Sequence, residues 1–87
     1  MTKDKRYTSV RNLIGAGYIK AFREIFDTLP KSVVARDLGM NNTRFSRLMD
    51  NVDEFSLKEI FLMAFLLDIN ESVMLDIVLR QRAQDRK

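Results

Sequence analysis

The stretch KSVVARDLGMNNTRFSRLMD, residues 31–50, decides the fold of this 87-residue chain. Its pattern predicts two short helices joined by a tight turn. Val34 and Leu38 lie one turn apart on the first helix, so both side chains face inward. Gly39 follows directly, at a helix end that favours the left-handed conformation that glycine adopts at least cost.

The predicted helices span residues 31–38 and 42–50. Ala35 is small, so the second helix can cross closely over the first. Phe45 and Leu48 are three residues apart and anchor the second helix to the core. The opposite face of that helix carries polar side chains suited to the edges of DNA bases, namely Asn42, Thr43, Ser46 and Arg47.

The segment resembles the helix-turn-helix of the phage repressor and Cro family, often called XRE-like. The downstream sequence FSLKEIFLMAFLLDI, residues 55–69, is similar to the family as well. The resemblance covers residues 19–79, with an N-terminal arm and a short helix before it (1–18) and a basic tail after it (80–87). It implies an all-α fold, a lambda-repressor-like bundle of about five helices.

Helices are also predicted on both sides of the motif. A short one over residues 9–16 would be capped by Ser9, after a mobile basic end formed by residues 1–8. A second would run over residues 19–28 and stop before Pro30. Either Asn41 or Asn42 is expected to cap the second motif helix.

After a loop at residues 51–55, Ser56 and Glu59 form a capping-box pattern that opens an apolar helix ending near residue 67. Asn70 is expected to cap a last helix. The chain from residue 80 would continue as a solvated basic segment. The main buried stripe of the apolar helix is predicted to be Leu57, Ile60, Phe61, Ala64 and Phe65.

The amino-acid composition excludes several classes of function. The chain has no Cys and no His, which removes disulfides, thiolate nucleophiles, histidine bases and the usual zinc sites. No glycine-rich phosphate loop and no paired catalytic carboxylates stand out, so we expect no enzyme, no cofactor and no small-molecule ligand. The polar start lacks a signal-peptide core, and the longest apolar run, 60–67, is too short for a membrane span. A cytoplasmic protein is expected, nucleoid-associated when bound to DNA.

Charge is distributed unevenly along the chain. Residues 1–30 carry six basic and three acidic side chains, and residues 31–50 carry four and two. Residues 51–79 carry one basic and six acidic side chains, and residues 80–87 carry four and one. A polyanion would therefore be attracted to the part of the molecule that contains the motif.

The resemblance places base contacts at Asn42, Thr43, Ser46 and Arg47. Arg47 could form a bidentate pair with guanine or contact phosphate, and Asn42 could read adenine or serve only as a helix cap. For Arg44, an ion pair with Asp50 or Asp37 competes with the DNA backbone. The expected contacts to the DNA backbone are Lys31, Ser32, Asn41, Arg44, Lys20 and Arg23.

These patterns favour sequence-specific binding of double-stranded DNA by a repressor-like transcriptional regulator. Proteins of this kind usually pair on two half-sites, so a homodimer is expected, with a surface at 61–66 and 73–79. The alternative from another class is a protein-interaction module, such as an antitoxin-like or adaptor domain, whose DNA contact is lost or secondary.

Overall fold

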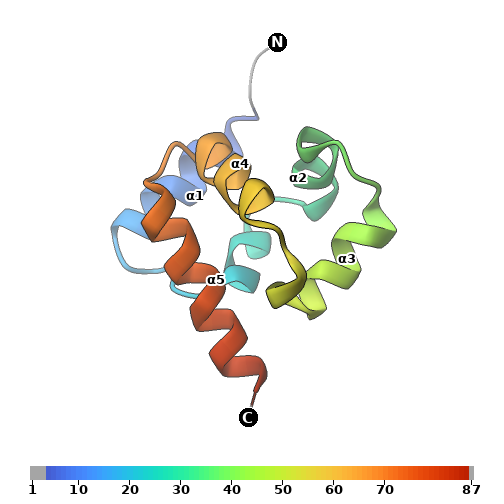
Figure 1. The fold of residues 1–87 in the computed structure, drawn as a ribbon. Coiled ribbons are helices and arrows are strands. Elements are labelled where there is room, and N and C mark those ends of the chain that lie inside the picture. The colour runs from blue at the N-terminus through green and yellow to red at the C-terminus, as the bar shows by residue number, and fades with distance from the viewer. Residues whose placement is uncertain (1–3, 87) are drawn as a thin grey trace.

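The computed structural model describes residues 4–86, and all regular structure in that range is helical (Figure 1). The predicted all-α class is therefore confirmed. The described chain contains five α-helices and two short 3-10 helices. Their bounds are α1 Arg6–Gly15, η1 Phe22–Asp27, α2 Lys31–Leu38, α3 Asn42–Asp50, η2 Val52–Glu54, α4 Leu57–Leu67 and α5 Glu71–Asp85.

The helices α2 and α3 have the bounds expected for the quoted stretch. Pro30, with φ of −61°, precedes α2 and suits the start of a helix. Gly39 ends α2 in the left-handed conformation, with φ of 75°. Asn41 caps α3, since its side-chain oxygen accepts a hydrogen bond of 2.7 Å from the backbone N–H of Arg44.

Four phenylalanines form the centre of the core. Their rings meet edge to face, with centroids 5.2 to 5.9 Å apart. Such pairs add roughly 0.5–1.5 kcal/mol each beyond their buried area. The cluster joins η1, α3 and the segment that follows η2, and its members are Phe22, Phe26, Phe45 and Phe55.

The first helix begins earlier than expected, at Arg6 instead of Ser9. Tyr7 is buried, and its hydroxyl donates a hydrogen bond of 2.8 Å to Asp37 in α2. The prediction of a mobile end is therefore wrong for residues 6–8, because the Tyr7 ring is part of the core; residues 1–3 lie outside the described range.

The predicted α-helix over residues 19–28 is replaced by the shorter 3-10 helix η1. The side chain of Glu24 accepts hydrogen bonds from the backbone N–H groups of Lys20 and Ala21, at 2.7 and 2.8 Å. The N–H of Arg23 donates instead to the side-chain oxygen of Gln81, at 3.0 Å. The side chains of Glu24 and Gln81 therefore provide hydrogen-bond acceptors for the backbone N–H groups at the start of η1. These N–H groups do not need an α-helix to be satisfied.

The helix α4 buries only part of the predicted stripe, since Ile60 and Ala64 are buried but Phe61 is 39% exposed. Its capping box is confirmed, with mutual hydrogen bonds between Ser56 and Glu59 of 2.9 and 3.1 Å. However, Leu57 and Phe65 are 60% and 75% exposed. Because α4 is apolar nearly all round, periodicity alone could not set its rotation about its axis. The buried residues are Ile60, Met63, Ala64 and Leu67.

The last helix extends farther than expected. Asn70 caps α5 as predicted, by accepting from the backbone N–H of Ser72 at 2.8 Å. The segment predicted as a solvated continuation remains helical to Asp85, and Gln81 within it is buried. Likewise, the predicted loop at residues 51–55 forms η2 and buries Val52. No helix of the described chain is both long and apolar enough to cross a membrane.

Candidate nucleic-acid interface

The helices α2 and α3 lie side by side at one edge of the molecule (Figure 1). Phe45 and Leu48 are buried and hold one face of α3 against the core. The predicted base-contacting residues therefore face outward. Asn42, Thr43 and Arg47 are exposed, and Ser46 is half-buried.

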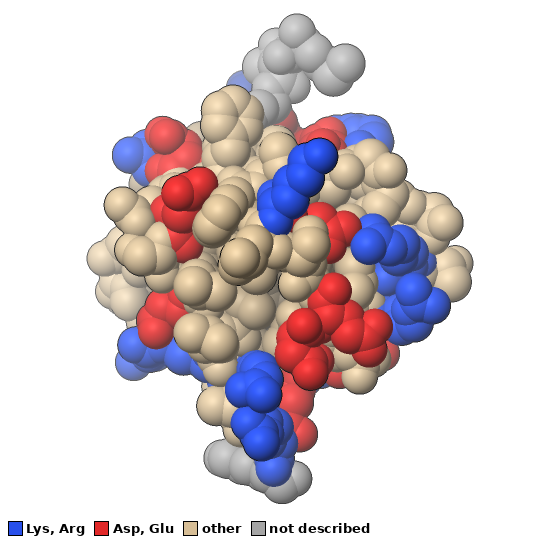
Figure 2. Space-filling model, in the orientation of Figure 1, with Lys and Arg blue, Asp and Glu red and all other residues tan. Residues whose placement is uncertain are grey.

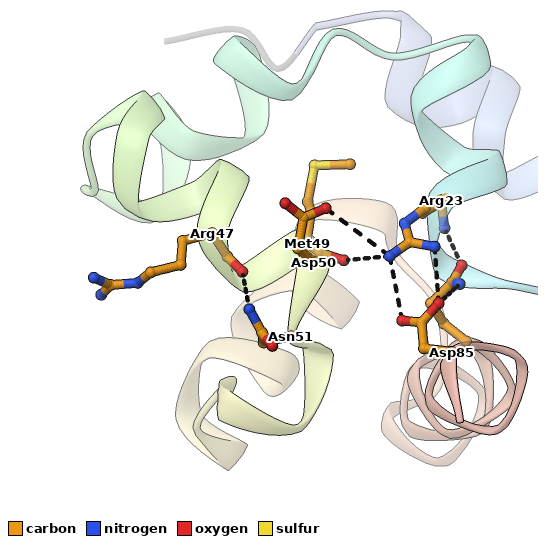
Figure 3. A network of polar contacts seen from close by, with 7 residues as sticks. Arg23, Arg47, Met49, Asp50, Asn51 and Asp85 are labelled. Carbon is orange, nitrogen blue, oxygen red and sulfur yellow. Dashed lines mark hydrogen bonds and ion pairs between the residues drawn. The ribbon is translucent and has the colours of Figure 1, made fainter. Parts of the chain in front are cut away.

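The guanidinium of Arg47 makes no hydrogen bond or ion pair within residues 4–86. The carbonyl oxygen of Arg47, by contrast, accepts hydrogen bonds from the backbone N–H and from the side chain of Asn51, at 3.1 and 3.2 Å. Figure 3 shows the Arg47 side chain extending away from the other labelled residues. All five N–H donors of this guanidinium can therefore meet an external acceptor.

The structure separates the roles of the two asparagines at the start of α3. Asn41 is the cap, so the oxygen of its side chain is already used. Asn42 is the first residue of the helix, and its exposed amide makes no hydrogen bond inside the described chain. The reading of Asn42 as a cap is therefore wrong, and its amide has both a donor and an acceptor to offer.

Arg44 has an internal partner that neither expected alternative identified. Its guanidinium lies 2.9 Å from the carboxylate of Glu59 in the first turn of α4. Burial by itself would raise the pKa of Glu59, but hydrogen bonds from Ser56 and Arg44 outweigh it and hold the pKa below its ordinary value. Arg44 must therefore leave this ion pair, or share it, to reach a phosphate.

Arg23 is engaged in the network of polar contacts drawn in Figure 3. Its guanidinium lies 2.8 Å from the carboxylate of Asp85, reaches the carbonyl oxygen of Met49 at 3.3 Å and comes within 4.0 Å of Asp50. The view places Arg23 on the other side of α3 from the Arg47 guanidinium. The structure therefore does not bring these two arginines together.

The first turn of α2 presents two of the predicted backbone contacts. Lys31 and Ser32 are exposed, and their backbone N–H groups have no acceptor within the described residues. Free amides at a helix start carry partial positive charge and favour an anion. Lys20 is also exposed, but it belongs to the segment before η1 and not to α2 or α3.

Acidic groups lie at the far end of α3. The side chain of Asp50 is 78% exposed, and the exposed residues Asp53 and Glu54 follow on η2. Figure 2 shows basic and acidic side chains next to one another around the rim of a largely uncharged area over α4 and α5. Phosphates would consequently be attracted to the start of α3 and repelled from its end.

Two hydrogen bonds of the structure could not be predicted from the sequence. Tyr7 and Asp37 are thirty residues apart in the chain, and Gln81 bonds to the backbone of Arg23 from fifty-eight residues away. No local pattern marks either pair. Glu59, the partner of Arg44, was recognised only as part of its capping box.

We compared the chain with protein-family models, with curated proteins and with solved structures, and none of them matches it.

Proposed function

We propose that the chain binds double-stranded DNA sequence-specifically through α3, as a repressor-like transcriptional regulator of the phage repressor and Cro type that acts as a dimer. The observation that carries the proposal is the outward polar face of α3. Asn42 and Arg47 are exposed there, their side chains have no hydrogen-bond partner among residues 4–86, and Phe45 and Leu48 fix the helix from behind. The backbone that carries these side chains is thus already ordered before binding, so the cost of ordering on binding is limited to the side chains themselves.

In the proposed complex, α3 enters the major groove and α2 lies across the DNA backbone. Arg47 donates to the two acceptors of a guanine, and Asn42 pairs with an adenine through its amide. Thr43 and Ser46 supply shorter contacts to base edges. The free amides of Lys31 and Ser32 receive a phosphate at the start of α2.

A single short helix touches few bases, which supports a dimer on two half-sites about ten base pairs apart. Arg44 has a conditional role in this scheme. It exchanges its contact with Glu59 for a phosphate, or bridges the two, so its contribution to affinity is reduced by the loss of an ion pair.

The test is selection of bound sequences from a random DNA library at near-physiological salt. Wild type should enrich a palindrome. Arg47→Ala should lose roughly 1–3 kcal/mol on that site and relax the preference at one position of each half-site. Arg82→Ala is the matched control, since Arg82 is an exposed arginine on α5 with no internal partner in residues 4–86.

An equal loss on all sequences would mean that Arg47 contacts phosphate. Binding without enrichment, or no binding, would contradict the proposal. It would favour the alternative of a protein-interaction module, such as an antitoxin-like or adaptor domain, for which pull-down of a partner is the next measurement.

A further inference from the structure

The outer face of α4 carries an apolar stripe. Its residues Leu57, Phe61 and Phe65 follow each other at intervals of four, and Leu62 lies beside them. All four are among the exposed large hydrophobic side chains of the molecule. Below, "the α4 stripe" means these four residues. The uncharged area seen over α4 and α5 in Figure 2 includes this face.

Within the α4 stripe, Leu57 and Phe65 are placed symmetrically about Phe61. Leu57 and Phe65 lie about 6 Å from it along the helix axis, one on either side. An interface with two-fold symmetry requires one patch to complement itself. Two antiparallel copies of α4 would place Phe61 opposite Phe61 and Leu57 opposite Phe65, so each of these three side chains would meet an apolar partner.

Shape and charge favour the same arrangement. A groove of about 320 Å³ lies beside Phe61 and Phe65, and its far end is lined by Asp68 and Glu71. If Leu57 of a second copy entered this groove, its neighbour Lys58 would lie next to those carboxylates. A parallel arrangement would instead bring the two Lys58 side chains toward each other, which is unfavourable.

We propose that a second copy of this chain covers the α4 stripe, with the two α4 helices antiparallel and the two-fold axis at Phe61. The inference deepens the dimeric part of the proposed function and rests on it for its biological purpose. It also restricts the dimer surface that the sequence predicts at residues 61–66 and 73–79 to a smaller set of residues. Met63 and Ala64 on α4 and Ile77 and Val78 on α5 are buried within the monomer and are not free to pair.

The size of the α4 stripe sets the expected strength of pairing. Its side chains expose roughly 400 Å² in each copy, about half of what a standard interface buries per partner. The dimer should therefore be weak and concentration-dependent without DNA. Binding of both half-sites on one duplex would stabilise it, because ligands that bind the dimer shift the equilibrium toward it.

The first test measures oligomeric state without DNA, by sedimentation equilibrium up to near-millimolar concentration. Wild type should shift from monomer to dimer as concentration rises. The double variant Leu57→Glu/Phe65→Glu should remain monomeric, since it places like charges in the interface. Tyr18→Glu is the matched control, because Tyr18 is 76% exposed and lies outside α4. Helical content by circular dichroism checks that each variant is folded.

The second test uses the absence of cysteine from the chain. Leu57→Cys and Phe65→Cys variants are mixed with their thiols reduced and then treated with a short thiol-reactive bifunctional cross-linker. The antiparallel arrangement predicts that the mixed 57–65 product dominates. The Phe61→Cys variant alone should also form a cross-linked dimer, since residue 61 lies on the axis.

Three outcomes would overturn the inference: a monomer at every concentration, a dimer insensitive to the double variant, or dominant 57–57 and 65–65 products. None of them bears on DNA recognition by α3, since no DNA is present. Conversely, a chain that dimerises through the α4 stripe but enriches no DNA sequence would contradict only the proposed function.

Discussion

Gly39 determines the turn between α2 and α3 at the scale of a single residue. Its backbone is left-handed, and the N–H of Met40 donates to the carbonyl oxygen of Ala35 at 3.0 Å, which closes the end of α2. A Cβ atom added at Gly39 would meet no atom within 4 Å. The requirement for glycine is therefore one of backbone conformation and not of space.

Gly39→Val should accordingly lower the free energy of unfolding by roughly 1–3 kcal/mol, because a β-branched residue is strained at positive φ. Gly39→Asn is the control, since asparagine tolerates this conformation better and should lose clearly less. Urea unfolding followed by circular dichroism measures both. Equal stability of the valine variant and wild type would contradict the left-handed assignment.

Gln81 offers a second test at this scale. Gln81→Leu keeps the buried volume but leaves the backbone N–H of Arg23 without its acceptor. An unsatisfied buried donor costs roughly 1–3 kcal/mol. Gln84→Leu, at an exposed position of the same helix, should leave stability nearly unchanged. Equal stability of the two variants would show that the Gln81 bond contributes nothing.

At the scale of elements, the Arg44–Glu59 ion pair joins α3 to α4. It therefore links the proposed recognition helix to the helix that carries the α4 stripe. Glu59 is also the reciprocal partner of Ser56 in the capping box. The carboxylate of Glu59 thus caps the start of α4 and also holds α3 against α4 through Arg44.

This carboxylate predicts a dependence of stability on pH. The pKa of Glu59 is lowered in the folded state, so its contribution is present above the pKa of an unfolded glutamate, about 4.3, and is lost as pH falls below that value. Glu59→Gln should consequently show a smaller drop in melting temperature than wild type between neutral and acidic pH.

Glu54→Gln is the control for this comparison, because Glu54 is exposed and makes no ion pair in the described chain. Its melting temperature should follow that of wild type as pH falls. A Glu59→Gln profile that also matches wild type would rule out the assigned role of Glu59.

At the scale of the whole molecule, contacts between distant segments hold a small core together. The described chain measures 38 × 30 × 22 Å, so few residues lie far from solvent. Tyr7 links α1 to α2 through Asp37, whose carboxylate also accepts from Arg36. Burial raises the pKa of the Tyr7 hydroxyl, and the hydrogen bond to Asp37 adds to the shift, so this donor keeps its proton at neutral pH.

Tyr7→Phe should therefore destabilise the fold by roughly 1.5–3 kcal/mol, the contribution of a hydrogen bond to a charged acceptor. For a chain of this size, that corresponds to a fall of about 6–24 °C in melting temperature. Tyr18→Phe should have no effect, because Tyr18 is exposed. A normal melting temperature for Tyr7→Phe would mean that water replaces the hydroxyl without loss.

Part of the candidate interface could be predicted from the sequence. The part that could not be predicted depends on contacts between residues that are far apart along the chain. The outward direction of Asn42 and Arg47 follows from helical spacing relative to Phe45 and Leu48. The ion pair between Arg44 and Glu59 does not, because it depends on how α3 packs on α4. The engagement of Arg23 by Asp85 is of the same kind.

Local sequence patterns specify the helical class, the bounds of α2 and α3, the turn at Gly39 and the caps at Ser56 and Asn70. These features depend on hydrogen bonds and conformations within a few residues, which local sequence specifies. Only the tertiary structure decided the rotation of α4, the 3-10 form of η1 and the burial of Gln81. Each of these depends on partners far along the chain, because burial is shared among elements that meet only in the folded molecule.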